Sequence, residues 1–174
     1  MKANLNRKGI SNVVATIILI AVAIALAVAV AVWVFGLAGS SAKTATLQVQ
    51  AVGLTGISKG TATLTLLISN PSSSGVGING FTLGSLSCVF SQPVQVPAGT
   101  QGGQLIITLT VTQKGQFSTS PQDISVSGTG GISVPQNISV TCNGNQTAAV
   151  GIQYSGYITT VSGQTYPFTV TASS

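Results

Sequence analysis

Few side chains in this sequence could carry out chemistry. Asp123 is the only carboxylate side chain, and the sequence has no histidine and no glutamate. Acid–base catalysis, metal binding and nucleophile activation usually draw on these residue types. Because neither a carboxylate pair nor a Ser–His arrangement can form, the composition argues against an enzyme. It also predicts no cofactor and no metal site.

Cys88 and Cys142 are the only two cysteines. A redox site is not expected, because no CxxC spacing and no neighbouring basic residue would lower the pKa of either thiol. In an exported domain an even number of cysteines favours a disulfide. Closing a loop of this length would stabilise the fold by about 4 kcal/mol in the chain-entropy model. Two buried free thiols are the alternative.

Two asparagines lie in the acceptor pattern for N-glycosylation. They are Asn137, in Asn137-Ile138-Ser139, and Asn145, in Asn145-Gln146-Thr147. Asn70-Pro71-Ser72 does not fit the pattern, because proline occupies its middle position. Such triplets also arise by chance in a chain rich in Asn, Ser and Thr.

Two other groups of residues could bind ligands. Tyr154, Tyr157 and Tyr166 near the C-terminus could form a sugar-binding surface, but core packing and strand propensity also explain them. The glycine runs Gly75-Val76-Gly77 and Gly128-Thr129-Gly130-Gly131 have neither a helical pattern nor Lys-Ser/Thr after them. We therefore expect loops there, not phosphate-binding sites.

The formal charge of +5 does not indicate nucleic-acid binding. Three of the six basic residues lie within the first eight positions. Lys43, Lys59 and Lys114 are scattered and form no stripe. Beyond the first nine residues the chain has only these three bases and one acid, so its surface is almost uncharged.

An uncharged stretch from Ile10 to Ala42 holds the apolar run Val13 to Ala38. As a helix that run would be about 39 Å long, which is enough to cross a hydrocarbon core of about 30 Å with some tilt. Residues 21–32 alternate Ala with larger apolar residues, as a strand would. Both members of the alternation are apolar, and an isolated strand in lipid leaves its backbone unpaired. We therefore predict a helix over residues 10–40.

The same alternation places alanines four residues apart along the helix. Neighbouring helices could approach closely along such seams of small residues, although alanine is also common in apolar helices generally. The two predicted packing seams are Ala21, Ala25, Ala29 and Ala23, Ala27, Ala31.

Met1 to Gly9 are polar and basic, and they precede the apolar run. The positive-inside rule places this end in the cytoplasm and everything after Lys43 outside. The apolar run is longer than in an ordinary secretory signal, and Gly39-Ser40-Ser41-Ala42 is only a weak cleavage site. The sequence therefore predicts a precursor in the cytoplasmic membrane and an extracellular domain.

Glycines and small residues end the helix near Gly39. We expect Gly36, Gly39 and the segment 41–45 to act as a hinge. From residue 46 onward β-branched residues alternate with polar ones, and turn residues separate the runs. This pattern predicts an antiparallel β-sandwich over residues 46–174, Ig-like in general architecture, and hence an α+β chain. The predicted strands are 46–52, 61–69, 104–112, 136–142, 147–155, 157–161 and 166–171, with a hairpin turn at 162–165.

The start of the apolar run resembles the class III signal of archaeal type IV pilins. The resemblance rests on Arg7-Lys8-Gly9-Ile10-Ser11 and the apolar continuation to residue 38, about a fifth of the chain. It implies that a prepilin peptidase cuts after Gly9 and leaves Ile10 as the new N-terminus. Bacterial type IV pilins carry a glutamate five residues into the mature chain. The valine at that position, Val14, favours the archaeal branch.

The resemblance implies a structural subunit of an extracellular adhesion pilus. An assembly ATPase and a membrane platform protein would extract the processed subunit, and identical helices would bundle into the core of a homo-oligomeric filament. The filament would contact surfaces or other cells. Exported proteins of this family are often glycosylated, which favours Asn137 and Asn145. An archaellin, a pilin-like sugar-binding subunit and a non-polymerising anchored surface protein are the alternatives.

Overall fold

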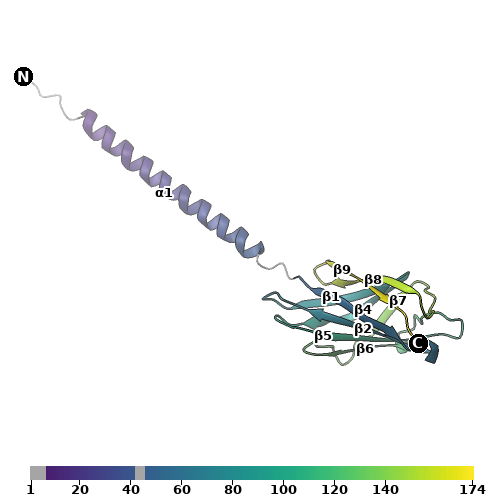
Figure 1. Ribbon diagram of the computed structural model, residues 1–174. Coiled ribbons are helices and arrows are strands. Elements are labelled where there is room, and N and C mark those ends of the chain that lie inside the picture. Colours follow the sequence, from purple (N-terminus) through teal and green to yellow (C-terminus); the bar gives the residue numbers. More distant parts are fainter. Residues whose placement is uncertain (1–6, 42–45) are drawn as a thin grey trace, which may run out of the picture. The chain divides into compact units, whose positions relative to one another are not determined.

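The computed structural model describes the backbone of residues 7–41 and 46–174, and the side chains of residues 11–37 and 46–174 (Figure 1). The chain divides into two compact units, residues 1–44 and residues 45–174. The first unit holds a single long helix. The second holds two antiparallel sheets. The predicted α+β organisation, an apolar helix followed by a β-sandwich, is confirmed.

Helix α1 runs from Arg7 to Ser41, 35 residues. It begins three residues before the predicted start at Ile10 and ends one residue beyond position 40. The alternation of Ala with larger residues over positions 21–32 does not produce a strand. Alanine and leucine are good helix formers, and the helix satisfies its own backbone hydrogen bonds without a partner strand.

The second unit contains nine strands and two short 3₁₀ helices in the described residues. Figure 1 labels most of the strands. The strands are β1 (Gln48–Thr55), β2 (Thr61–Ser69), β3 (Val76–Leu83), β4 (Leu86–Val96), β5 (Gly103–Thr110), β6 (Ile124–Thr129), β7 (Val140–Asn143), β8 (Gln153–Thr160) and β9 (Thr165–Thr171). The 3₁₀ helices are η1 (Ile57–Lys59) and η2 (Pro121–Asp123).

The strands form a four-stranded sheet, β1-β2-β5-β6, and a five-stranded sheet, β7-β4-β3-β8-β9. Every neighbouring pair within a sheet is antiparallel. The two sheets meet where β1 lies beside the end of β9. There Leu54 pairs with Ala172 in a parallel bridge, and the Ser173 N–H donates to the Leu54 carbonyl at 2.8 Å.

The core lies between the two sheets and follows the two-residue period of the strands. Leu64, Leu66 and Ile68 of β2 are fully buried. Their neighbours in β5 are equally buried, and so are residues of the facing sheet such as Ile78 and Ile158. The alternate residues of β2 and β5 are mostly threonines, which give the outer face of the four-stranded sheet an uncharged hydroxyl surface.

Two predicted strands were wrong over most of their length. Of the strand expected over 136–142 only residues 140–142 are extended, because residues 136 and 137 form a turn and β7 begins at Val140. We expected a strand over 147–155, but β8 begins only at Gln153. Gly151 has φ +82°, a left-handed conformation that interrupts an extended chain. Val150 and Ile152 are 49% and 46% exposed, so the apolar alternation there does not mark a buried face.

Three strands were missed. β3 begins inside the run that we expected to be a loop, because Val76 and Gly77 already pair with β4. β4 contains Pro93 and an irregular register opposite β3, which hides its alternation. β6 ends in the second glycine run, at Thr129, and Gly130 and Gly131 then form a turn with positive φ.

Asn70 holds the chain where it leaves β2. The side chain is fully buried, and its Nδ2 donates to the carbonyls of Ser74, Val96 and Pro97 at 2.9, 3.1 and 3.1 Å. The Asn70 Oδ1 accepts from the Ser72 backbone N–H at 3.2 Å. This side chain therefore ties the β2–β3 connection to the end of β4.

Asn70→Ala is expected to lower the free energy of unfolding by about 2–3 kcal/mol. The substitution leaves buried carbonyls without a donor, and each unmade buried hydrogen bond costs about 1–3 kcal/mol. Urea unfolding followed by circular dichroism measures the change, with Asn137→Ala at an exposed position as the matched control. A loss no larger than the control's would contradict the bridging role of Asn70.

Candidate functional site

Helix α1 presents an apolar surface on every side. Every side chain from residue 11 to residue 37 is exposed, and the large ones include Trp33 and Phe35 at 68% and 78%. The segment Ser11–Leu37 is long and apolar enough to cross a membrane. Near the start of this segment, the Thr16 hydroxyl donates to the Asn12 carbonyl at 2.8 Å, so this polar group is satisfied within the helix.

The alanine seams lie within this exposed helix. Ala21, Ala25 and Ala29 recur every four residues, as do Ala23, Ala27 and Ala31, and all six are exposed. Residues four apart lie one above another on a helix. Each seam is thus a shallow strip between larger side chains, where the backbone of a second helix can approach closely.

The residues predicted for processing lie at the beginning of α1. Arg7, Lys8, Gly9 and Ile10 have helical backbone, and their side chains lie outside the described residues. The remaining residues of the predicted signal, 1–6, also lie outside them. The predicted cleavage after Gly9 stays a prediction.

The predicted hinge residues fall in and after the end of α1. Gly36 and Gly39 both have helical backbone, and α1 continues to Ser41. A Cβ added at Gly36 would meet no atom within 4 Å. Residues 42–45 of the predicted hinge lie outside the described residues.

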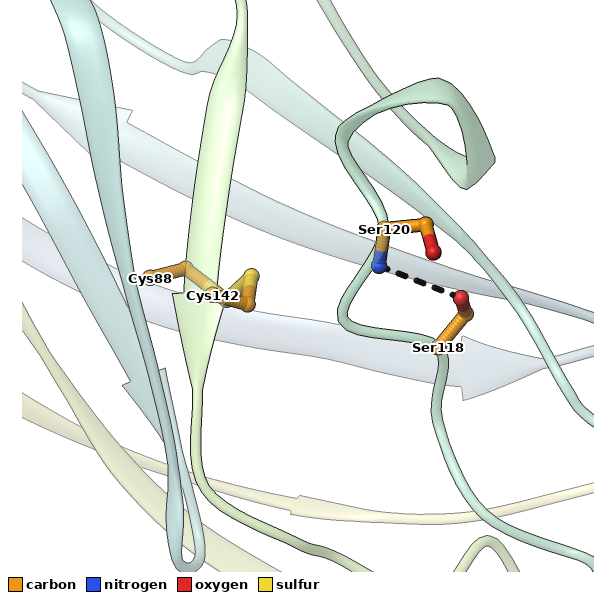
Figure 2. The surroundings of a disulfide bond; sticks show 4 residues. All are labelled: Cys88, Ser118, Ser120 and Cys142. Carbon is orange, nitrogen blue, oxygen red and sulfur yellow. Dashed lines mark hydrogen bonds between the residues drawn. A yellow bond between two sulfur atoms is a disulfide. The ribbon is translucent and has the colours of Figure 1, made fainter.

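The two cysteines are brought together as predicted. Cys88 of β4 and Cys142 of β7 are direct partners in the ladder, with a Cα–Cα distance of 4.1 Å, and they form a disulfide (Figure 2). The two residues are 2% and 5% exposed, so the bond lies against the core. It joins neighbouring strands of one sheet, whereas the antibody-domain disulfide bridges the two sheets of the sandwich.

Asp123 has a local structural partner. Its Oδ2 accepts from the Ser118 hydroxyl at 2.7 Å. The Ser118 Oγ in turn accepts from the Ser120 backbone N–H at 3.3 Å, the bond that Figure 2 shows. The carboxylate thereby holds the turn that enters η2. The neighbours of this carboxylate are a hydroxyl group and a backbone turn, so its interactions stabilise the conformation of the loop.

The two glycosylation candidates are accessible. Asn137 and Asn145 are both exposed, the first in the connection before β7 and the second in the connection after it. The Asn145 carbonyl accepts from the Ser85 hydroxyl at 2.6 Å, so its backbone is fixed while its side chain faces solvent. Asn70, which lacks the pattern, is buried.

The three tyrosines do not form one surface. Tyr154 is 3% exposed, and its hydroxyl donates to the Thr147 carbonyl at 2.8 Å and accepts from the Ala149 N–H at 2.9 Å. The Tyr166 hydroxyl donates to the Gln164 Oε1 at 2.8 Å. Tyr157 is 44% exposed on the outer face of the five-stranded sheet. Only Tyr157 presents much of its ring to solvent.

An apolar helix followed by a disulfide-closed β-sandwich defines the class of this chain. No protein-family model and no curated protein sequence matches it.

Proposed function

We propose that the chain is the structural subunit of an archaeal type IV adhesion pilus. The observation that carries the proposal is the exposed apolar surface of α1 directly after Arg7-Lys8-Gly9. Removing one large apolar side chain from water contributes about 1.5–3 kcal/mol. The helix carries more than a dozen such side chains, so it must lie in lipid or against other helices.

Processing and bundling would both depend on the N-terminal end of this helix. The basic residues hold the N-terminus on the cytoplasmic side, where a prepilin peptidase would cut after Gly9. The cut removes three basic side chains and leaves one α-amine at the helix start. It therefore lowers the cost of entering an apolar bundle, because each buried unpaired charge is costly. An assembly ATPase and a membrane platform protein would then move the subunit out of the bilayer.

The alanine seams support a filament in preference to a solitary anchor. Helices in lipid gain little from apolar burial alone, and they associate by close packing at small residues. A head-to-tail contact between identical subunits does not close on itself, so it grows into a filament. The β-sandwiches, almost free of charge, would form the outside of the filament and contact surfaces or other cells.

N-terminal sequencing of protein from sheared cell-surface filaments tests the proposal. We expect Ile10 as the first residue, because the cut after Gly9 keeps the helix on the mature subunit. Met1 would indicate an unprocessed surface anchor. A start beyond Lys43 would indicate an ordinary secretory signal. Either result would contradict the pilin assignment.

A further inference from the structure

A hollow of about 100 Å³ opens on the outer face of the five-stranded sheet. The residues that line it come from β4, β3 and β8, three neighbouring strands. Val89 forms part of one wall and Tyr157 part of the other. The hollow therefore lies over the central strand β3, on the side of the sheet away from the core.

The hollow exists because β3 has a glycine, Gly80, between the side chains of Asn79 and Thr82 that also line it. Phe81 is only 1% exposed and belongs to the core, and Gly80 has no side chain. A Cβ at Gly80 would overlap the Cys88 carbonyl oxygen, so β3 and β4 can approach this closely only with glycine there. The floor of the hollow is therefore formed by the backbone at Gly80 and by Thr82, which is 7% exposed.

The two walls stand on the strands on either side of β3. Gly80 pairs with Val89 in β4 and with Thr159 in β8. Those two strands are separated by two interstrand spacings, about 10 Å. Val89 is 53% exposed and Tyr157 is 44% exposed. The Tyr157 backbone N–H donates to the Thr82 hydroxyl at 3.0 Å, which fixes the strand that carries the ring.

Polar side chains around the hollow are available to a ligand. Asn79, Ser87 and Thr159 line it, and their side chains make no hydrogen bond to any residue that the structure describes. The Tyr157 hydroxyl likewise has no partner among those residues. By contrast, the Thr82 hydroxyl on the floor is already bonded to the β8 backbone.

The face around the hollow carries no charge. The five strands β7, β4, β3, β8 and β9 contain no Asp, Glu, Lys, Arg or His. Lys59 and Asp123 lie on η1 and η2, and Lys114 lies in the turn after β5. These five strands thus offer no fixed charge that would attract a phosphate, a carboxylate or an ammonium group.

We propose that this hollow binds one ring of a neutral saccharide. The electron-rich face of Tyr157 would contact the C–H groups of the ring, and Val89 would contact its far edge. The amide of Asn79 and the hydroxyls of Ser87 and Thr159 would bond the sugar hydroxyls, in the usual combination of an apolar wall and a few polar groups. The site does not depend on whether the chain polymerises.

The test uses the full chain in a phosphocholine detergent, because a maltoside detergent would itself present a sugar. Saturation-transfer NMR with cellobiose, lactose and mannobiose detects binding, and glucuronic acid and glucosamine serve as charged comparators. We expect saturation of ring protons in at least one neutral disaccharide. We also expect its loss in Tyr157→Ala and a several-fold reduction in Asn79→Ala. Thr171→Ala, at an exposed position on the edge strand β9 of the same sheet and opposite Gln153, should bind as the wild type does.

Fluorotyrosine labelling gives a second readout, because the chain has only three tyrosines. The neutral disaccharide should shift the ¹⁹F signal that disappears in Tyr157→Phe and leave those of Tyr154 and Tyr166 in place. No binding by the whole panel, equal binding of the charged sugars, or unchanged binding in Tyr157→Ala would overturn the proposal. A Tyr157 signal that moves with protein concentration in the absence of sugar would also overturn it, since a second copy would then fill the hollow.

Discussion

Gly9→Val is expected to abolish both processing and filament formation. A peptidase that cuts after Gly9 must bring the backbone of this residue close to its catalytic groups, and glycine allows such an approach. A branched side chain there would displace the scissile bond, and a displacement of about 1 Å can cost about 100-fold in rate. The uncut chain would keep its basic N-terminus, which the apolar bundle excludes.

The measurement is the mass of the chain in membranes and in sheared filaments, in cells that make no other major pilin. The mutant should be found in membranes alone, with residues 1–9 still attached. Gly36→Val is the matched control, since it makes the same change in the same helix far from the cut and should be processed normally. Normal filaments from the Gly9→Val chain would contradict the cleavage site.

The helix could be predicted from sequence because its physical requirement is local. In lipid, a single apolar segment of this length satisfies its backbone hydrogen bonds only as a helix. The period-two alternation over residues 21–32 would suggest a strand if the membrane were ignored. Both residue types in the alternation are apolar, so it does not mark one buried and one solvent-exposed face as a strand's alternation does. The end of the helix was less predictable, since Gly36 and Gly39 both have helical backbone.

Whether a strand could be predicted depended on how regularly its apolar and polar residues alternate. β2 has Ala62, Leu64, Leu66 and Ile68 all buried on one face, and its bounds, Thr61–Ser69, are those predicted. β3 carries glycine at positions 77 and 80, where neighbouring groups leave little or no room for a side chain. Such glycines look like loop residues in the sequence, and only the pairing with β4 explains them.

The candidate site was partly visible in the sequence. The even cysteine count and the predicted export were enough to favour the disulfide, although they did not place both cysteines in one sheet. The hollow beside Tyr157 could not be predicted. It depends on which of three tyrosines faces outward and on a bulge that leaves Gly80 between Val89 and Thr159. Both are properties of strand register, which a single sequence does not reveal.

Removing the disulfide with Cys88→Ala and Cys142→Ala is expected to lower the stability of the domain by about 4 kcal/mol. The bond closes a loop of 54 residues, and it restricts the unfolded chain accordingly. For a domain of this size the change corresponds to a fall in Tm of about 15 °C. The effect should be largest at β7, which has four residues and pairs with β4 alone in its sheet.

Urea unfolding of the double variant measures the loss, and amide hydrogen exchange locates it. Thr141→Ala, at the exposed position of β7 next to Cys142, is the matched control and should cost less than about 0.5 kcal/mol. We expect the amides of β7 to exchange faster in the double variant. The relative protection of the amides in β2 and β5 should not change, because these central strands pack in the core independently of the disulfide. A double variant as stable as the control would show that edge pairing alone holds β7. The disulfide would then contribute nothing measurable to the stability of the domain.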